Sequence, residues 1–185
     1  MCKFTFLFVL STYVFTFWNT KKSRTFAKND FMPDKKKVLM VCLGNICRSP
    51  LAEGLLRSKV DPAKVYVDSA GLSSYHIGEP PCPTSQDVAR KHGLDISNLR
   101  ARAFKVSDFD EFDHIYIMDR YNWDLIQQKA RNKKDLLKVD YILNAIFPGE
   151  NMEVPDSYQK GKNAAELVYQ MLDEATDVLA KKLQA

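Results

Sequence analysis

The sequence of 185 residues lacks the features that identify several large classes of protein. It contains no internal repeat and no low-complexity tract, so a single non-repetitive domain is the expected organisation. Its 27 basic and 23 acidic residues are spread along the chain, which argues against the clustered basic face of a nucleic-acid-binding protein. With 45% hydrophobic residues, the chain can bury one core and has little room for a second.

Histidine and cysteine are also scarce, with three and four residues respectively. A metal site built on Cys42 and Cys47 has few residues to complete it, and none of them falls at ligand spacing from another. These residues are Cys82, His76, His92 and His114. The sequence therefore predicts no metal site.

The cysteine positions also bear on the compartment of the protein. Four cysteines allow two disulfide bridges, but Cys42 and Cys47 lie in the loop that carries the clearest chemical signal of the chain. Structural disulfides at these positions would consume the nucleophile described below. A reducing compartment is therefore favoured, and a cytoplasmic location is expected.

The first 35 residues differ in composition from the rest. Residues 4–18 form an uncharged run rich in aromatic side chains, which is the pattern of a signal peptide or a membrane anchor. The run falls short of the roughly 20 residues that span a bilayer, and no small-x-small cleavage site follows it. We therefore favour a mis-assigned start with Met32 as the first residue. Residues 1–35 are then an extension outside the fold, residues 36–185 are the domain, and no stable membrane association is expected.

From Val38 onward, short apolar runs alternate with amphipathic stretches. Residues 38–43 are continuously apolar, as expected for a strand buried on both faces of a parallel sheet. Ser49 and Pro50 predict the N-cap and first position of the helix that follows. Further strands are expected over residues 64–68, 115–118 and 139–143, with helices from residue 84, around residues 123–126 and over residues 164–183. This alternation predicts an α/β fold with a doubly wound sheet.

The most informative segment reads VCLGNICRSP. Cys42 ends the first predicted strand, and functional residues of such folds gather at the carboxyl edge of the sheet. The free N–H groups and positive end of the next helix stabilise a bound anion and favour the thiolate form of the cysteine. Arg48 adds a planar fork for two phosphate oxygens, and Gly44 and Asn45 suit positions with positive φ. The segment predicts phosphate-ester chemistry with Cys42 as nucleophile, and Ser49 is close enough in sequence to donate its hydroxyl to the thiolate.

A thiolate that displaces phosphate from an ester needs an acid to protonate the leaving oxygen. Such an acid typically contributes about 10²- to 10⁴-fold to the rate. The sequence VPDSY offers Asp156 beside a proline that stiffens the approach, and Tyr158 can flank the opening. On its own, this stretch has the composition of a surface turn with a solvated aspartate.

These motifs resemble those of the low-molecular-weight protein tyrosine phosphatases. VCLGNICRSP is similar to the phosphate-binding loop of that family, DSAG at residues 68–71 stands where the family has it, and VPD matches the start of its acid loop. The resemblance runs from about residue 36 to the C-terminus. It implies a four-stranded parallel sheet flanked by helices, protein-tyrosine phosphatase activity, and no metal or organic cofactor. The implied partner is a phosphotyrosine-containing protein or a small aryl phosphate, with no nucleic acid and no indication of an oligomeric state.

The resemblance also implies a role for individual residues. Cys42 would form a phosphocysteine intermediate, Arg48 would bind phosphate, and Asp156 would act as general acid and then as general base. Cys47 would trap an oxidised Cys42 as a reversible disulfide. The implied phosphate-binding loop is Leu43, Gly44, Asn45, Ile46, Cys47, Arg48 and Ser49, with loop support from Asn45 and Ser69 and a substrate cleft lined by Tyr75 and Tyr158.

Some positions depart from the family pattern. The acid loop of the family commonly continues with a proline and two tyrosines, whereas this chain has Ser157, Tyr158 and Gln159. One aromatic wall is therefore missing, and Tyr75 is expected to supply another. Asn98 stands where a histidine often supports the loop network, which leaves the stability of the loop in question.

Three alternative functions remain open at this point. Arsenate reductase shares the fold and the loop but needs further cysteines, and after Cys47 only Cys82 is left, in a proline-rich loop. Phosphoarginine phosphatase is disfavoured by Ile46, where such relatives tend to have threonine, and by the aromatic cleft residues. A catalytically silent phosphoprotein-binding module is disfavoured because the nucleophile, arginine and acid are all present.

Overall fold

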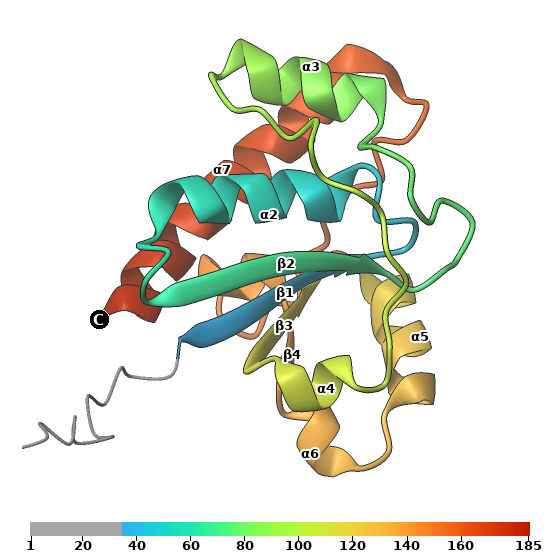
Figure 1. Cartoon of the computed structure of the whole chain (residues 1–185), viewed down its shortest axis with the longest axis vertical. Helices are drawn as coiled ribbons and strands as arrows, with labels where there is room; N and C mark the ends of the chain where they lie inside the picture. The colour runs from blue at the N-terminus through green and yellow to red at the C-terminus, as the bar shows by residue number, and fades with distance from the viewer. Residues whose placement is uncertain (1–34) are drawn as a thin grey trace, which may run out of the picture. The chain divides into compact units, whose positions relative to one another are not determined.

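Residues 35–185 are described by the computed structural model (Figure 1). Four strands form one parallel sheet in the order β2-β1-β3-β4. They are β1 (Lys36–Cys42), β2 (Val65–Gly71), β3 (His114–Ile117) and β4 (Val139–Tyr141). The predicted doubly wound, four-stranded parallel sheet is confirmed. The expectations for residues 4–18 and for a start at Met32 fall outside the described residues.

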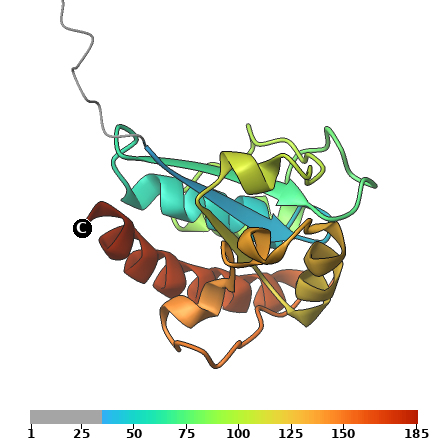
Figure 2. The ribbon, with the colours of Figure 1, turned by 90° about the horizontal axis from the view of Figure 1, so that it is seen from below.

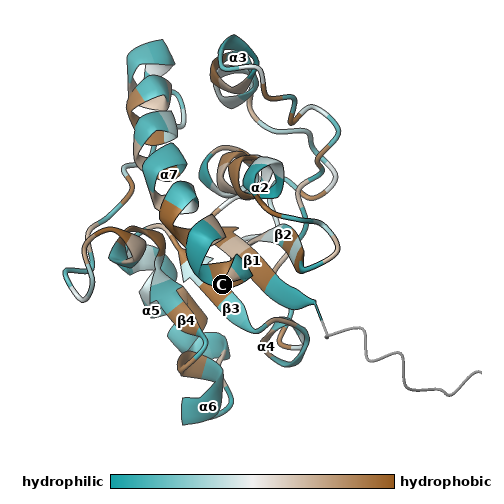
Figure 3. Ribbon diagram, turned by 90° about the vertical axis from the view of Figure 1, so that its left-hand side faces the viewer, coloured by the Kyte–Doolittle hydropathy of each residue, from teal (hydrophilic) through white to brown (hydrophobic). Residues whose placement is uncertain are grey.

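Helices cover both faces of this sheet (Figures 1 and 2). One face packs against α2 (Arg48–Lys59) and α7 (Gly161–Gln184), and α3 (Pro83–Lys91) packs on these two helices. The other face packs against α4 (Asp108–Glu111) and α5 (Arg120–Lys129), which α6 (Lys133–Leu136) follows. Strand β1 serves both cores, because successive side chains of a strand point to opposite faces. Val38 and Met40 belong to the first core, and Leu39 and Val41 to the second. In Figure 3 the strand changes accordingly from hydrophilic at its first residues to hydrophobic.

Helix α7 holds α2 in place over the sheet. Leu172 and Leu179 of α7 are fully buried in the shared core, and burying a leucine is worth about 1.5–3 kcal/mol. Lys59 at the end of α2 adds ion pairs to Asp173 at 2.6 Å and Asp177 at 2.8 Å. Such surface pairs contribute little each, so apolar burial provides most of the attachment. Because α2 is attached in this way, the loop that leads from β1 into α2 has a fixed end point on the domain.

Three details differ from the sequence-based expectations. Helix α2 begins at Arg48 with Cys47 as its N-cap, so the prediction of Ser49 as the cap was wrong. Pro50 still fits, because N–H groups in the first turn of a helix have no intrahelical acceptor to lose. Strand β4 ends at Tyr141 and continues as the 3₁₀ helix η1 (Ile142–Ala145), and the four-residue helices α4 and α6 had not been predicted.

The strand order determines where a functional site can form. The chain leaves β1 for β2 on one side and later returns to β3 on the other, which makes the carboxyl end of β1 a topological switch point. Cys42 ends β1, Gly71 ends β2, and Asp119 follows β3 as the N-cap of α5. Among residues 35–185, no helix has both the length and the apolar character needed to cross a membrane.

Candidate active site

The loop after β1 turns sharply around its neighbours. Asn45 has a φ of +56°, a left-handed conformation that asparagine tolerates better than most residues. Gly71 at the end of β2 leaves room for the loop. A Cβ at Gly71 would lie 3.1 Å from the carbonyl oxygen of Leu43 and from Cβ of Asn45. The glycine of the DSAG motif is thus required by close packing of backbone against backbone.

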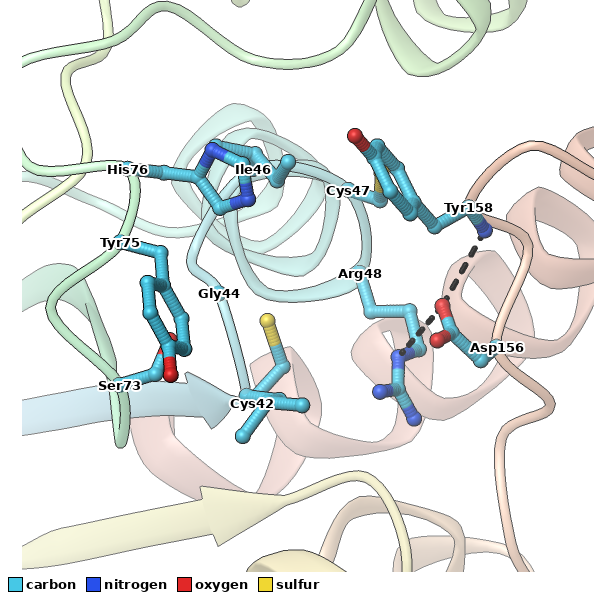
Figure 4. A pocket seen from close by; sticks show the side chains of 11 residues that line it. Cys42, Gly44, Ile46, Cys47, Arg48, Ser73, Tyr75, His76, Asp156 and Tyr158 are labelled. Carbon is cyan, nitrogen blue, oxygen red and sulfur yellow. Dashed lines mark hydrogen bonds and ion pairs between the residues drawn. The ribbon is translucent and has the colours of Figure 1, made fainter.

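The sulfur of Cys42 lies at the bottom of a pocket and points into it (Figure 4). Two groups approach the sulfur from the loop: Ser49 Oγ at 3.1 Å and the backbone N–H of Asn45 at 3.2 Å. Both can donate to a thiolate, and hydrogen bonds to the charged form of a group stabilise that form. Cys42 is almost fully buried, and these are the hydrogen bonds that its sulfur makes within residues 35–185.

Asn45 connects the loop to the rest of the domain. Its side-chain amide donates to Ser49 Oγ at 2.9 Å and to Ser69 Oγ at 2.8 Å. Its carbonyl oxygen accepts from the backbone N–H of Arg102 at 2.9 Å. Asn98, which stands where relatives often have a supporting histidine, is exposed, and in this chain the side-chain oxygen of Asn45 is bound by a backbone group. Both amide hydrogens and the amide oxygen of Asn45 are used.

The protons available in this network determine which group donates and which accepts in each of its hydrogen bonds. The amide of Asn45 can only donate, so Ser49 and Ser69 must both accept from it. Each serine hydroxyl then has its own proton left for another partner. Ser49 directs that proton at Cys42 Sγ, and Ser69 directs its proton at Glu53 Oε2, which is 2.5 Å away. The arrangement orients a hydroxyl donor toward the sulfur.

Glu53 is a buried carboxylate at the far end of this network. It lies on α2 and is 2% exposed. Burial raises the pKa of Glu53 to about 7, although the hydrogen bond from Ser69 and the positive charge of Arg57 oppose the rise. Arg57 Nη2 lies 2.8 Å from Glu53 Oε1, so both carboxylate oxygens are paired.

Arg48 lines the pocket, and two acceptors bind its guanidinium. Its Nη1 donates to Asp119 Oδ2 at 2.5 Å and to the carbonyl oxygen of Val154 at 3.2 Å. Burial acts to lower the pKa of Arg48, but the negative charges of Cys42 and Asp119 outweigh it and the pKa is raised. Asp119 also caps α5 by accepting the N–H of Asn122 at 2.7 Å. The arginine therefore stays charged and is fixed in orientation.

Asp156 lies across the pocket from Cys42, on the segment between η1 and α7 (Figure 4). Val154 anchors this segment, because its N–H donates to the carbonyl of Met118 and its carbonyl accepts from Arg48. Asp156 is half-exposed, with Oδ1 at 3.8 Å from Arg48 Nε and at 3.1 Å from the backbone N–H of Tyr158. The carboxyl is thus near the guanidinium of Arg48 and open to solvent.

Ser157 and Gln159, which follow Asp156 in the sequence, differ in burial and in backbone conformation. Ser157 is buried, and its hydroxyl has no hydrogen-bond partner among the described residues. Gln159 has a φ of +59°, which is strained for a residue with a side chain. The chain then enters α7 at Gly161.

The pocket has a volume of about 170 Å³ and aromatic side walls. The structure places Tyr75 and Tyr158 in its lining, together with His76 and Ser73. His76 meets the ring of Tyr158 edge to face with 6.1 Å between centroids, and its Nδ1 lies 2.8 Å from Glu79 Oε2. In Figure 4, Tyr75 and Tyr158 stand on opposite sides of the Cys42 sulfur.

Cys47 faces a second cysteine that the sequence placed in a loop. Cys82 is the N-cap of α3, and it packs with Cys47, Ile46 and Ala101 in a small buried cluster. All three cysteines of the described chain are free thiols. Among residues 35–185, no group of three histidine, cysteine or carboxylate side chains is arranged to hold a metal ion.

The sequence-predicted residues Cys42, Arg48 and Asp156 all line one pocket, and Asn45 and Ser69 join behind it. Asp119, Glu53 and His76 had not been predicted as site residues. Asp119 follows a strand at the carboxyl edge of the sheet, so the rule that singled out Cys42 would have found it. No local signal marks Glu53 or His76 as site residues, because the contacts that connect them to the site, with Ser69 and Tyr158, are made to other segments.

Comparisons with known proteins agree with this geometry. The family model described as "Low molecular weight phosphotyrosine protein phosphatase" matches residues 37–185. A low molecular weight phosphotyrosine protein phosphatase from Gallus gallus is 38% identical over 139 residues, covering 73% of this chain and 87% of that protein. The low molecular weight protein-tyrosine-phosphatase YfkJ from Bacillus subtilis is 34% identical over 151 residues, covering 80% and 95%.

Solved structures give the same result. The crystal structure of YfkJ aligns with a TM-score of 0.75 at 33% identity, covering 81% of this chain and 95% of that one. A protein tyrosine phosphatase from Entamoeba histolytica aligns with a TM-score of 0.75 at 31% identity, covering 81% and 97%. A Wzb from Vibrio vulnificus, solved with benzylphosphonate, aligns at 0.72 and 30% identity over 80% and 99%.

Proposed function

The chain belongs to the low molecular weight phosphotyrosine protein phosphatase family, and we propose that Cys42, Arg48 and Asp156 carry out its hydrolysis of phosphotyrosine. The protein is a protein-tyrosine phosphatase, a hydrolase of phosphoric monoesters. One observation carries the residue assignment. A sulfur with two hydrogen-bond donors, a buried arginine and a half-exposed carboxyl converge on one small pocket at the carboxyl end of β1.

The first step is attack by the Cys42 thiolate on phosphorus. Arg48 binds two phosphate oxygens with its planar fork, and the N–H groups of residues 43–49 surround the others. Asp156 in its protonated form gives a proton to the ester oxygen as the bond from phosphorus to that oxygen breaks. Tyrosine leaves as the neutral phenol, and the phosphoryl group stays on the Cys42 sulfur.

The second step regenerates the enzyme. Asp156, now a carboxylate, takes a proton from a water molecule that attacks phosphorus from the side the phenol has left. The bond from sulfur to phosphorus breaks, and inorganic phosphate is released. The hydroxyl of Ser49, which Asn45 orients, stabilises the thiolate that leaves. An acid and a base are thus supplied in turn by one carboxyl group.

The shape of the pocket supports an aromatic substrate. Tyr75 and Tyr158 both line the pocket, on opposite sides of the Cys42 sulfur in Figure 4, and a phenyl ring bound above the sulfur can pack against these aromatic side chains. Ile46 adds an apolar surface at the loop. A phosphotyrosine-containing protein or a small aryl phosphate is therefore the proposed substrate.

Thiol chemistry supports two further parts of the proposal. Cys47 lines the same pocket as Cys42, and we propose that it forms a reversible disulfide with an oxidised Cys42. Because the reaction needs Cys42 as a free thiolate, we propose a reducing compartment, the cytoplasm.

We also propose that residues 36–185 form the phosphatase domain and that residues 1–35 are an extension that the fold does not need. The family match begins at residue 37, which supports this boundary. A chain that starts at Met32 should match the full chain in phosphatase activity and melting temperature. Loss of folding in the shorter chain would contradict the boundary.

A competition between substrates tests the proposed function. Peptides carrying phosphotyrosine, phosphoserine or phosphoarginine are compared at equal concentration, with arsenate reduction followed in parallel by coupling to thioredoxin. We expect phosphotyrosine to be hydrolysed fastest and arsenate to be reduced negligibly. Preferred phosphoarginine hydrolysis or efficient arsenate reduction would transfer the function to one of those reactions, and no turnover of any substrate would indicate a binding module.

A further inference from the structure

Cys47 and Cys82 form a second thiol pair behind the phosphate-binding loop. They share a buried cluster with Ile46 and Ala101, and each is the N-cap of a helix, Cys47 of α2 and Cys82 of α3. The backbone N–H of Cys82 donates to the carbonyl of Ile46 at 2.6 Å, which ties the start of α3 directly to the loop. The two side chains pack in the same buried cluster, and each affects the pKa of the other. Cys47 is therefore in contact with Cys82 while it also lines the pocket of Cys42.

The surroundings of Cys82 favour a thiolate. Its sulfur lies 3.2 Å from Ser85 Oγ and 3.5 Å from Thr84 Oγ1, at the positive end of the nine-residue helix α3. Hydrogen bonding with Cys47, against the opposing effect of burial, lowers the pKa of Cys82 to about 5, and hydrogen bonding with Ser85 and Thr84 adds to the lowering. The same bond to Cys82, together with burial, raises the pKa of Cys47. Cys82 is therefore the more acidic thiol of the pair and the nucleophilic partner.

We propose that Cys82 is a resolving thiol, which moves an oxidative disulfide from the catalytic pocket to the Cys47–Cys82 pair and returns Cys42 to its thiolate form. The oxidant is a hydroperoxide small enough to enter the pocket. The idea rests on the proposed role of Cys42 as the reactive nucleophile, and it extends that role to a third cysteine. Its physical basis is the position of Cys47 between the Cys42 pocket and the Cys82 sulfur.

The steps balance in atoms and electrons. The Cys42 thiolate attacks hydrogen peroxide, takes one oxygen to become a sulfenic acid, and releases hydroxide. The Cys47 thiol then attacks the sulfenic sulfur, and its proton leaves with the hydroxyl group as water. The Cys82 thiolate next attacks the Cys47 sulfur of the resulting Cys42–Cys47 disulfide, and Cys42 leaves as a thiolate. Cys42 ends in its starting state, and the two oxidising equivalents rest on Cys47 and Cys82.

The relay predicts a phosphatase that tolerates limited oxidation. A Cys42–Cys47 disulfide removes the nucleophile, whereas a Cys47–Cys82 disulfide leaves it free. In this exchange the leaving thiolate, Cys42, regains its hydrogen-bond donors from Ser49 and Asn45. One equivalent of hydroperoxide should therefore change the disulfide pattern and leave most of the activity.

The experiment treats the reduced full-length chain with one molar equivalent of hydrogen peroxide. Phosphatase activity and the disulfide map of an alkylated, unreduced digest are measured on parallel samples. In the wild type we expect the Cys47–Cys82 bridge and largely retained activity. In Cys82→Ser we expect normal activity before treatment, and afterwards the Cys42–Cys47 bridge with activity lost until dithiothreitol is added.

Two further variants make the result specific. Cys2→Ser removes the remaining cysteine of the chain and should behave as the wild type. Ser85→Ala keeps all cysteines but removes a hydroxyl beside Cys82, and it should slow the appearance of the Cys47–Cys82 bridge. This variant also provides a test if Cys82→Ser does not fold.

The relay is overturned if the treated wild type carries mainly the Cys42–Cys47 bridge and loses activity as completely as Cys82→Ser does. A bridge map without Cys82 in any disulfide overturns it as well. Failure of the proposed function is distinct from both outcomes, because it shows as absent hydrolysis by the untreated, fully reduced protein, and the bridge map can still be read.

Discussion

The side-chain amide of Asn45 donates to the hydroxyl of Ser49 at 2.9 Å, and this contact determines where the proton of that hydroxyl points. Since Ser49 Oγ accepts from the amide, its own proton is free for the Cys42 sulfur at 3.1 Å. Asn45 is also the residue with positive φ at the turn of the loop. One side chain therefore sets both the shape of the loop and the direction of its hydrogen bonds.

Replacing Asn45 tests this arrangement. In Asn45→Ala the hydroxyl of Ser49 loses its orienting donor, and the turn loses a residue suited to positive φ. A hydrogen bond to a charged group is worth roughly 1.5–3 kcal/mol, so we expect kcat for phosphotyrosine peptides to fall about 10- to 100-fold. Asn151→Ala is the matched control, since Asn151 also has a positive φ but lies on an exposed turn. Equal kcat values in the two variants would contradict the role of Asn45.

Asp119 is expected to act by positioning Arg48. Asp119→Asn keeps an acceptor for the N–H of Asn122 and therefore keeps the cap of α5, but it removes the charge that holds the guanidinium. We expect kcat/KM to fall about tenfold or more with little change in melting temperature. Asp124→Asn removes a carboxylate of the same helix that pairs with exposed Arg120, and it should leave the kinetics unchanged. A large fall in melting temperature for Asp119→Asn would instead indicate a structural role.

The buried carboxyl of Glu53 predicts a pH-dependent stability. Its pKa is raised from 4.5 to about 7 in the folded protein, so between these values the folded chain binds a proton that the unfolded chain has released. The contribution of Glu53 to stability is therefore lost as the pH rises from about 4.5 through about 7, by on the order of 1–3 kcal/mol. Melting temperatures of Glu53→Gln should change less over this window than those of the wild type. Glu174→Gln, an exposed change on α7, should follow the wild type, and parallel curves for all three proteins would refute the assignment.

Sequence reasoning recovered the parts of the site that are local in the chain. The apolar run of β1, the glycine and asparagine of the loop, and Arg48 lie within a dozen residues, so spacing alone predicts their proximity. The segment that contains Asp156 could also be predicted locally, because it carries the short motif VPD. The parallel arrangement of the strands followed from the alternation of strands and helices, because parallel strands need crossover connections. The order β2-β1-β3-β4 had not been predicted.

Contacts between distant segments could not be read in this way. Arg48 and Asp119 are 71 positions apart, and their pairing depends on β1 and β3 being neighbours in the sheet. The contact between Cys47 and Cys82 depends on α3 packing its N-terminus against the loop, which no periodicity encodes. The predicted loop over residues 78–83 and the helix from residue 84 agree with the structure to within one residue, because α3 begins at Pro83.

Asp156 is expected to matter in both chemical steps. Asp156→Ala should lower kcat for phosphotyrosine peptides by about 10²- to 10⁴-fold while inorganic phosphate still inhibits, because Arg48 and the loop remain. Glu150→Ala removes an exposed carboxylate from the same segment and should have no such effect. An unchanged kcat in Asp156→Ala would assign the acid to another residue.

The measurement that tests the central claim most directly is trapping of the phosphorylated enzyme in Asp156→Ala. Nitrophenolate leaves without an acid, whereas hydrolysis of the intermediate needs the base that this variant lacks. Rapid acid quenching after addition of p-nitrophenyl phosphate should yield a burst of one nitrophenolate per enzyme and a phosphoryl group on the peptide that contains Cys42. No burst and no phosphorylated peptide, or a phosphoryl group on any other residue, would contradict the assignment of Cys42 as the nucleophile.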